Sequence, residues 1–391
     1  MGGATEDDNA MRWFLSRANG GDVVVLRASG SDGYNNYMMT LGPVVNSVET
    51  IVFNNATASF SDYVKQRITG AEAIWLAGGD QRDYVRYWRN TPVDRLINIG
   101  LAERNLVIGG TSAGMAVLGG CYFTAQKGTV ASYEALANPY HPRVTVDTAA
   151  FFHADFLKDV ITDTHYDDPD RRVKHSVFLA RLMKDHGLTS RGIACDEYTA
   201  VCIDTSGIAR VFGGAPAYSD FAYFIQPNCE LPEMMPESCI AGTPLTWDHT
   251  KKALKVYKIN GNTQGTRTFN LNDWETVSGG VWENWYVQNG VVGTEAGTAI
   301  DCSPAPGMEE KENNSVLARP AGQGLVEITA LTGHLVRIEV RDIAGQVLLS
   351  EPVDKKSSAI IRLPFQHKGG MLLLSVRTSS GIHHLKYMNR R

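Results

Sequence analysis

A glycine-rich pentapeptide places a serine where its hydroxyl can act as a nucleophile. Gly110-Thr111-Ser112-Ala113-Gly114 has the G-x-S-x-G pattern of a sharp strand-to-helix turn that exposes a serine. The apolar residues 106–108 before it predict a buried strand, and residues 113–118 predict a helix. The Ala113 N–H at that helix start is free to stabilise an oxyanion. A glycine-rich turn that binds phosphate, or nothing, is the alternative.

A serine nucleophile needs a base within hydrogen-bond reach and an acid that orients the base. His165 is the candidate base because it follows a strand-like run and precedes a long helix predicted over residues 174–188. The alternative is a loop histidine bonded only to Asp167 or Asp168. Glu197 is the candidate acid, since it ends a strand among apolar neighbours, where a carboxylate needs a partner such as an imidazolium.

The acidic run Asp167-Asp168-Pro169-Asp170 is a weaker candidate, for a calcium site. It lacks the glycine and the closing glutamate of a calcium-binding loop, which disfavours calcium. We therefore predict no metal ion and no cofactor.

Apolar runs alternate with helical patterns through the first half of the chain. Strands are predicted over residues 22–28, 49–53, 73–77 and 106–108, and helices over 59–69, 82–90 and 92–104. This alternation predicts an α/β fold with a doubly wound parallel sheet. Ligands bind at the carboxyl ends of such strands. Both Gly78-Gly79-Asp80-Gln81 and the Ser112 turn follow strand ends.

The length of 391 residues predicts more than one domain. Residues 1–302 form the expected catalytic domain, with its core at about 22–212 and a β-rich extension behind it. Residues 303–324 have the proline, glycine and charge of a linker. Residues 325–391 alternate as five or so short strands, typical of a small β-sandwich, with turns expected at Asp342-Ile343-Ala344-Gly345 and Ser379-Ser380-Gly381.

Charge and hydropathy exclude some classes of partner. The net charge of −5 argues against a nucleic-acid or anionic-membrane surface, and no apolar run reaches the ~18 residues that span a bilayer. Cys229 and Cys239 flank a proline-rich loop and would pair if the protein is exported. The start is no signal peptide; Met1-Gly2-Gly3 has the character of an added stretch, and we expect the trimmed start of an exported protein.

Four motifs together resemble the cyanophycinase and dipeptidase E family of serine peptidases over about residues 22–212. They are Gly78-Gly79-Asp80-Gln81, Gly110-Thr111-Ser112-Ala113-Gly114, Asp163-Thr164-His165 and Asp196-Glu197-Tyr198-Thr199-Ala200. The resemblance implies a fold like the class I glutamine amidotransferase domain, with Ser112 as nucleophile, His165 as base and Glu197 as acid. It implies an oxyanion hole of backbone amides near Asp80 and at Ala113. The expected substrate-binding residues are Gln81, Asp163, Arg171, Arg172 and Arg181.

The order serine, histidine, glutamate argues against an α/β-hydrolase lipase, in which the acid precedes the histidine. The loop after the histidine departs from the cyanophycinase branch, which carries closely spaced arginines there; only Arg181-Leu182 matches cleanly. We therefore predict cleavage of short peptides beside aspartate and weak action on poly-Asp-Arg. A substrate carboxylate needs a guanidinium, and Arg171 and Arg172 are preferred because they share the His165 loop.

The C-terminal residues carry a second resemblance. Val340-Arg341-Asp342-Ile343-Ala344-Gly345-Gln346-Val347, the stretch 369–376 and a basic end with Lys386, Arg390 and Arg391 are similar to the sorting domain of the type IX secretion system. This implies export to the surface or medium and the secretion machinery as a partner. A β-sandwich that binds carbohydrate, or packs on the catalytic domain, is the alternative.

The chain is thus expected to be a secreted serine peptidase acting on peptides. An esterase with the same triad is a competing enzyme class. A catalytically silent surface-binding protein on a peptidase scaffold is the non-enzyme alternative. The sequence leaves a homodimer open.

Overall fold

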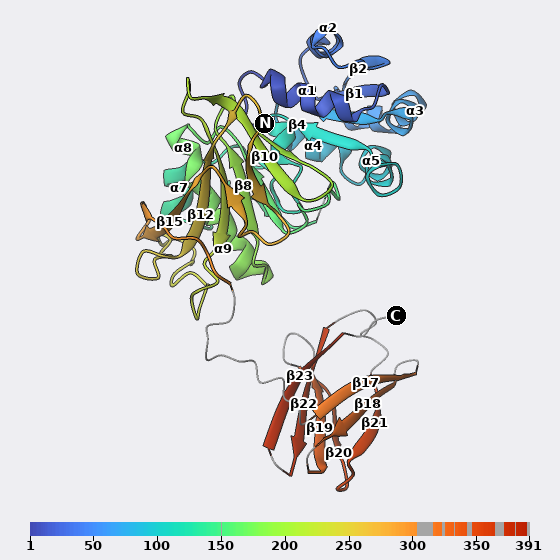
Figure 1. Ribbon diagram of the computed structural model, residues 1–391, viewed down its shortest axis with the longest axis vertical. Helices are drawn as coiled ribbons and strands as arrows, with labels where there is room; N and C mark the ends of the chain where they lie inside the picture. The colour runs from blue at the N-terminus through green and yellow to red at the C-terminus, as the bar shows by residue number, and fades with distance from the viewer. Residues whose placement is uncertain are drawn as a thin grey trace. The chain divides into compact units, whose positions relative to one another are not determined.

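The computed structural model describes residues 1–149, 151–302, 316–322, 325–331, 333–341, 346–363, 371–379 and 381–388. The chain divides into two compact units, Met1–Cys302 and Ser303–Arg391 (Figure 1). Among the described residues, no helix is both long enough and apolar enough to cross a bilayer.

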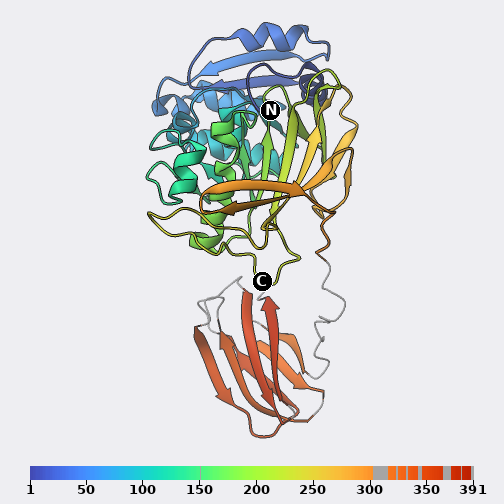
Figure 2. The same cartoon turned by 90° about the vertical axis from the view of Figure 1, so that its left-hand side faces the viewer.

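The first unit begins with a four-stranded parallel sheet in the order β2-β1-β3-β4 (Figures 1 and 2). Successive side chains of a strand point to opposite faces. Val24 and Leu26 of β1 therefore pack on helices α3, α4 and α5, while Val23 and Val25 pack on α1 and α2. The elements are α1 (Asp8–Arg17), β1 (Asp22–Arg27), α2 (Gly33–Thr40), β2 (Ser47–Val52), η1 (Ala56–Phe60), α3 (Asp62–Gly70), β3 (Ala73–Leu76), α4 (Gln81–Trp88), α5 (Pro92–Glu103) and β4 (Val107–Gly110). The prediction of a parallel sheet with helices on both faces is confirmed for these strands.

The second half of this unit is a mixed sheet of six strands in the order β16-β15-β12-β11-β8-β7. Only the β7–β8 pair within it is parallel. Helices α7 and α9 cover one face, and the other face packs on a smaller sheet in the order β14-β13-β10-β9. The elements are α6 (Ala113–Ala116), β5 (Tyr122–Phe123), α7 (Ser132–Ala137), β6 (Val146–Asp147), β7 (Val160–Asp163), α8 (Pro169–Arg172), α9 (Lys174–His186), β8 (Arg191–Cys195), β9 (Ala200–Ile203), β10 (Ile208–Ala215), β11 (Phe221–Pro227), β12 (Leu254–Asn260), β13 (Arg267–Asn270), β14 (Val277–Ser278), β15 (Val281–Gln288) and β16 (Val291–Ala296). The fold is therefore mixed α/β, and its doubly wound part is limited to four strands.

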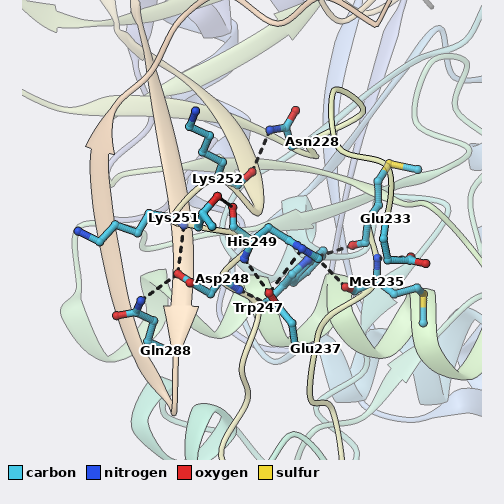
Figure 3. Close-up of polar contacts among 12 residues, drawn as sticks. Asn228, Glu233, Met235, Glu237, Trp247, Asp248, His249, Lys251, Lys252 and Gln288 are labelled. Carbon is cyan, nitrogen blue, oxygen red and sulfur yellow. Dashed lines mark hydrogen bonds and ion pairs between the residues drawn. The ribbon is translucent and has the colours of Figure 1, made fainter. Parts of the chain in front are cut away.

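The long loop between β11 and β12 is held by its own polar contacts (Figure 3). The Glu237 carboxylate accepts the backbone N–H groups of Asp248 at 2.9 Å and His249 at 2.7 Å. The indole of Trp247, which is fully buried, donates to the Met234 carbonyl at 3.0 Å. These contacts fold the loop back on the α7–α9 face of the mixed sheet.

Cys229 is bonded to Cys302, 73 residues away. The expected Cys229–Cys239 pair is wrong, because Cys239 is a free thiol buried in the core beneath α9. Polar contacts bring the end of the first unit to Cys229: the backbone N–H of Asp301 donates to Glu230 at 3.1 Å.

The second unit is two antiparallel sheets with one apolar core between them. Its strands are β17 (Val316–Gly322), β18 (Leu325–Ala330) and β21 (Ser358–Arg362) in one sheet, and β19 (Leu335–Arg341), β20 (Val347–Pro352), β22 (Met371–Thr378) and β23 (Gly381–Met388) in the other. The linker predicted over 303–324 is wrong at its end, because β17 pairs with β18. The predicted turn at 342–345, Ser380, Arg390 and Arg391 lie outside the described residues.

Candidate active site

Ser112 sits on the turn between β4 and α6, with φ of 50° and ψ of −120°. A Cβ on Gly114 would lie 2.0 Å from the Leu76 carbonyl oxygen, and one on Gly110 would lie 2.6 Å from the Gly114 backbone. Both positions therefore require glycine, since α6 crosses directly over the end of β3. The strand predicted to stop at Ile108 continues through both glycines, because hydrogen bonds to β3 extend that far.

The three predicted triad side chains form one hydrogen-bonded chain. Ser112 Oγ lies 2.7 Å from His165 Nε2, and His165 Nδ1 lies 2.6 Å from Glu197 Oε1. His165 follows β7 and Glu197 follows β8, so adjacent parallel strands present the base and the acid. Asp167 is not the partner of the histidine; its carboxylate accepts the Glu197 backbone N–H at 3.0 Å.

Each of the three loops that carry the triad residues includes a non-glycine residue with positive φ. The values are 50° at Ser112, 53° at His165 and 57° at Tyr198, which directly follows Glu197. Such conformations cost roughly 1–3 kcal/mol each and persist only where the surroundings enforce them. The loops of the site are therefore held by contacts beyond their own turns.

A cavity of about 250 Å³ opens beside the serine. Its lining includes Asp80, Gln81, Ser112 and Ala113, together with residues between the end of β7 and the start of α9. The two predicted oxyanion-hole residues, Asp80 and Ala113, thus share the cavity with the nucleophile. A larger cavity of about 690 Å³ lies beside β4 but includes no triad residue, so the smaller cavity is the candidate substrate site.

The lining of the small cavity includes three charged side chains, those of Asp163, Arg171 and Lys174. Lys174 Nζ lies 3.6 Å from Asp163 Oδ1, and both side chains are almost fully buried. The second oxygen, Asp163 Oδ2, is buried with no hydrogen-bond partner among the described residues. Arg171 is 41% exposed and pairs with Asp168 at 3.5 Å. Sequence reasoning missed Lys174, which it treated as the first residue of an amphipathic helix.

Two of the predicted substrate-binding arginines are not in the cavity. Arg172 donates from Nε to the Tyr166 carbonyl at 2.7 Å and lies over the Tyr223 ring. Arg181 pairs with Asp185 and donates to the Pro139 carbonyl at 2.8 Å. Their guanidinium donors are engaged in the fold, so the prediction that they bind substrate is wrong. Gln81, Asp163 and Arg171 do line the cavity.

Residues 1–3 are buried against the triad loops. The backbone N–H of Ser112 donates to the Met1 carbonyl at 3.1 Å, and that of His165 donates to the Gly2 carbonyl at 2.9 Å. These three residues are therefore part of the folded unit.

Among the side chains that the structure describes, no group of three or more histidine, cysteine or acidic residues is placed to hold a metal ion. In the acidic run considered for calcium, Asp167 accepts the Glu197 amide and Asp168 pairs with Arg171.

The model of peptidase family S51 matches residues 10–211 of the chain. The chain belongs to peptidase family S51. It is 26% identical over 210 residues to the cyanophycinase of Synechococcus elongatus and to that of Thermosynechococcus vestitus, covering 51% of this chain and 59% of each relative. The chain therefore spans less than two thirds of the curated relatives that it matches.

The structure of a peptidase from an acI-B1 Actinobacterium is 16% identical, with a TM-score of 0.37, and covers 53% of this chain and 82% of that one. A score this low carries no argument about the site. The residues that the family model matches contain Ser112, His165 and Glu197.

Proposed function

We propose that this S51 peptidase hydrolyses peptide bonds through Ser112, His165 and Glu197. The supporting observation is the unbroken hydrogen-bond chain from Ser112 Oγ through His165 to Glu197. A serine hydroxyl is a weak nucleophile unless a base removes its proton, and the base works best in one tautomer held by a carboxylate. The domain then has the character of the class I glutamine amidotransferase fold, with serine at the nucleophile position.

In the first step Ser112 Oγ attacks the scissile carbonyl carbon while its proton moves to His165 Nε2. The carbonyl oxygen becomes an oxyanion, which accepts hydrogen bonds from the N–H groups of Ala113 and of the Asp80 turn. The imidazolium then gives its proton to the leaving amine as the C–N bond breaks, and an acyl-serine remains. Water, deprotonated by His165, then attacks the ester carbonyl; the bond from that carbon to Ser112 Oγ breaks, His165 returns the proton to Oγ, and the acid product leaves. Glu197 stays ionised and holds the Nδ1 proton throughout.

We propose a preference for peptides with aspartate beside the cleaved bond. Arg171 and Lys174 are the two cations of the cavity wall, and an ionised donor binds a carboxylate about twice as strongly as a neutral one. Lys174 is already balanced by Asp163, whereas Arg171 is partly exposed. Arg171 is therefore the residue that meets the substrate carboxylate. The pairing of Arg171 with Asp168 partly neutralises this cation, so we expect weak action on poly-Asp-Arg.

A serine-directed fluorophosphonate tests the mechanism directly. The reagent should label the native protein at Ser112, as found by peptide mass spectrometry, and should not label the Ser112→Ala variant. Labelling without peptide cleavage but with hydrolysis of simple esters would identify an esterase. No labelling of the folded protein would identify the catalytically silent scaffold.

A peptide library tests the specificity. We expect enrichment of aspartate at one side of the cleaved bond, with asparagine-containing counterparts cut more slowly. A profile without acidic preference would refute the assignment, and efficient digestion of poly-Asp-Arg would show that the altered loop does not limit the substrate.

We also propose that the protein is exported, with residues 325–391 acting as a type IX sorting domain. The Cys229–Cys302 disulfide supports export, because such bonds persist in oxidising compartments. The seven described strands of the second unit are compatible with a separate module. In the source bacterium, a chain ending at Cys302 should stay in the cell, whereas the full chain should reach the medium or surface. Equal export of both chains would refute the sorting role.

A further inference from the structure

We propose that residues 1–3 are a positioning segment that holds the three triad loops in register. Three consecutive carbonyls of this segment each accept a backbone N–H from a different arm of the triad. The donors are Ser112 to Met1 at 3.1 Å, His165 to Gly2 at 2.9 Å, and Tyr198 to Gly3 at 3.3 Å. The inference rests on the proposed function, because the segment is proposed to act by positioning Ser112, His165 and Glu197.

The segment is itself fixed on both sides. The Met1 nitrogen donates to the Gly110 carbonyl at 2.8 Å, and the Gly2 N–H donates to the Thr199 carbonyl at 2.9 Å. These bonds tie it to the end of β4 in the parallel sheet and to the turn before β9. All three residues are buried, and Figure 1 marks the N-terminus between β4 and β10.

Side-chain-free residues are required at positions 2 and 3. A Cβ on Gly2 would lie 1.9 Å from the Asp196 carbonyl oxygen. A Cβ on Gly3 would lie 2.3 Å from Cε1 of the His165 ring, and Gly3 has φ of +127°. The imidazole of His165 thus packs directly against the Gly3 backbone.

The segment connects triad loops that follow strands of two different sheets. Ser112 follows a strand of the parallel sheet, whereas His165 and Glu197 follow strands of the mixed sheet. The donors Ser112, His165 and Tyr198 all have positive φ, one in each of the three triad loops. A row of carbonyls bonded to all three fixes the spacing between the nucleophile, the base and the acid, which no single loop can fix.

The substitution Gly3→Ala tests the proposal, with Gly42→Ala as the matched control. Gly42 has the same φ of +127°, but a Cβ there meets nothing within 4 Å. Both variants place alanine at the same positive φ, and only Gly3→Ala displaces the His165 ring. Because a misplacement of about 1 Å costs about 100-fold in rate, we expect kcat of Gly3→Ala to fall at least ~100-fold with KM within ~3-fold. Fluorophosphonate labelling should slow by a similar factor, and Gly42→Ala should match the unsubstituted chain.

A second readout separates positioning from mere destabilisation. The pH dependence of kcat/KM should change in Gly3→Ala, because displacing the ring alters its bonds to Ser112 and Glu197, and should not change in Gly42→Ala. A Gly3→Ala chain that keeps kcat within ~3-fold of the control and the same pH profile would overturn the proposal.

If Gly3→Ala does not fold, amide hydrogen exchange of the unsubstituted chain tests the positioning role instead. The amides of Ser112, His165 and Tyr198 should exchange at least ~100-fold more slowly than exposed loop amides. Exchange as fast as in those loops would overturn the positioning role. An active Ser112→Ala enzyme would instead refute the proposed mechanism, whatever the amide protection of the three residues.

Discussion

The two sides of the candidate active site are constrained in different ways. On the nucleophile side, the Ser112 turn is shaped by close backbone contacts, because a Cβ on Gly110 would meet the Gly114 backbone and one on Gly114 would meet the Leu76 carbonyl of β3. On the opposite side, Asp163, His165 and Glu197 depend on side-chain contacts between segments distant in the sequence. The close backbone contacts require glycines, which form a recognisable motif, whereas the side-chain contacts leave no such motif.

Buried charge marks the second side. Asp163 and Lys174 form a pair with almost no exposure to solvent. Asp196, next to Glu197, is also buried, and its Oδ2 accepts the Phe221 N–H at 2.9 Å. Removing one member of a buried pair leaves the other uncompensated, which costs several kcal/mol. The precise placement of the base and acid thus depends on ionisable groups that the chemistry itself does not use.

The largest expected effect comes from removing the nucleophile on one side of the site or the base on the other. Ser112→Ala and His165→Ala should each lower kcat by at least ~10⁴-fold, and the double variant should be hardly worse, because the two residues act as one unit. Steady-state kinetics on a good peptide substrate, with circular dichroism to check folding, measure this. Additive losses in the double variant would mean that the two sides work independently.

The acid should matter less than the nucleophile and the base. Glu197→Gln keeps a hydrogen-bond acceptor for His165 Nδ1 but removes the negative charge that stabilises the imidazolium. We expect kcat to fall by roughly 10²–10⁴-fold, the range of general acid–base contributions. A loss equal to that of Ser112→Ala would indicate that Glu197 holds the loop itself, and unfolding measured in parallel would reveal such a structural role.

The same contrast explains what the sequence could predict. The strands of the parallel sheet and the Ser112 turn follow from apolar runs and glycines, which are local signals. The extent of the mixed sheet does not, because antiparallel pairs such as β11–β12 join segments whose patterns suit many partners. Lys174 and residues 1–3 were missed since their roles arise only from what the fold packs around them. Arg172 was expected at the site because it shares the His165 loop, and Arg181 because it matches the family pattern; neither signal shows which way a side chain points.

A smaller effect should separate the arginines. Arg171→Gln removes the exposed cation of the cavity, and kcat/KM for an aspartyl peptide should fall about tenfold or more, because a charged hydrogen bond contributes ~1.5–3 kcal/mol. Arg181→Gln is the matched control: it should leave kcat/KM unchanged and lower only the stability, through its lost bonds to Asp185 and Pro139. The asparaginyl counterpart of the peptide should respond little to either change. Equal losses in both variants would place the carboxylate site elsewhere.

The smallest effect concerns stability rather than rate, and it isolates the buried charge next to Glu197. Burial raises the pKa of Asp196 to about 6 from its ordinary value of 3.8. The folded chain therefore holds a proton on this carboxyl that the unfolded chain releases between pH 3.8 and about 6. Stability from this group is fully present below pH 3.8 and is lost as the pH rises through about 6.

Asp196→Asn removes this dependence while keeping an oxygen that accepts the Phe221 N–H. The free energy of unfolding of the variant, minus that of the unsubstituted chain, should thus increase between pH 4 and 7 and then level off. Two pKa units correspond to ~3 kcal/mol at most. Denaturant unfolding of both chains across this range measures the difference, and taking the difference cancels other titrating groups such as His175, whose pKa burial lowers to about 4. A difference that stays flat with pH would mean that folding does not raise the pKa of Asp196. The carboxylate beside Glu197 would then be ionised in the fold at no cost in stability.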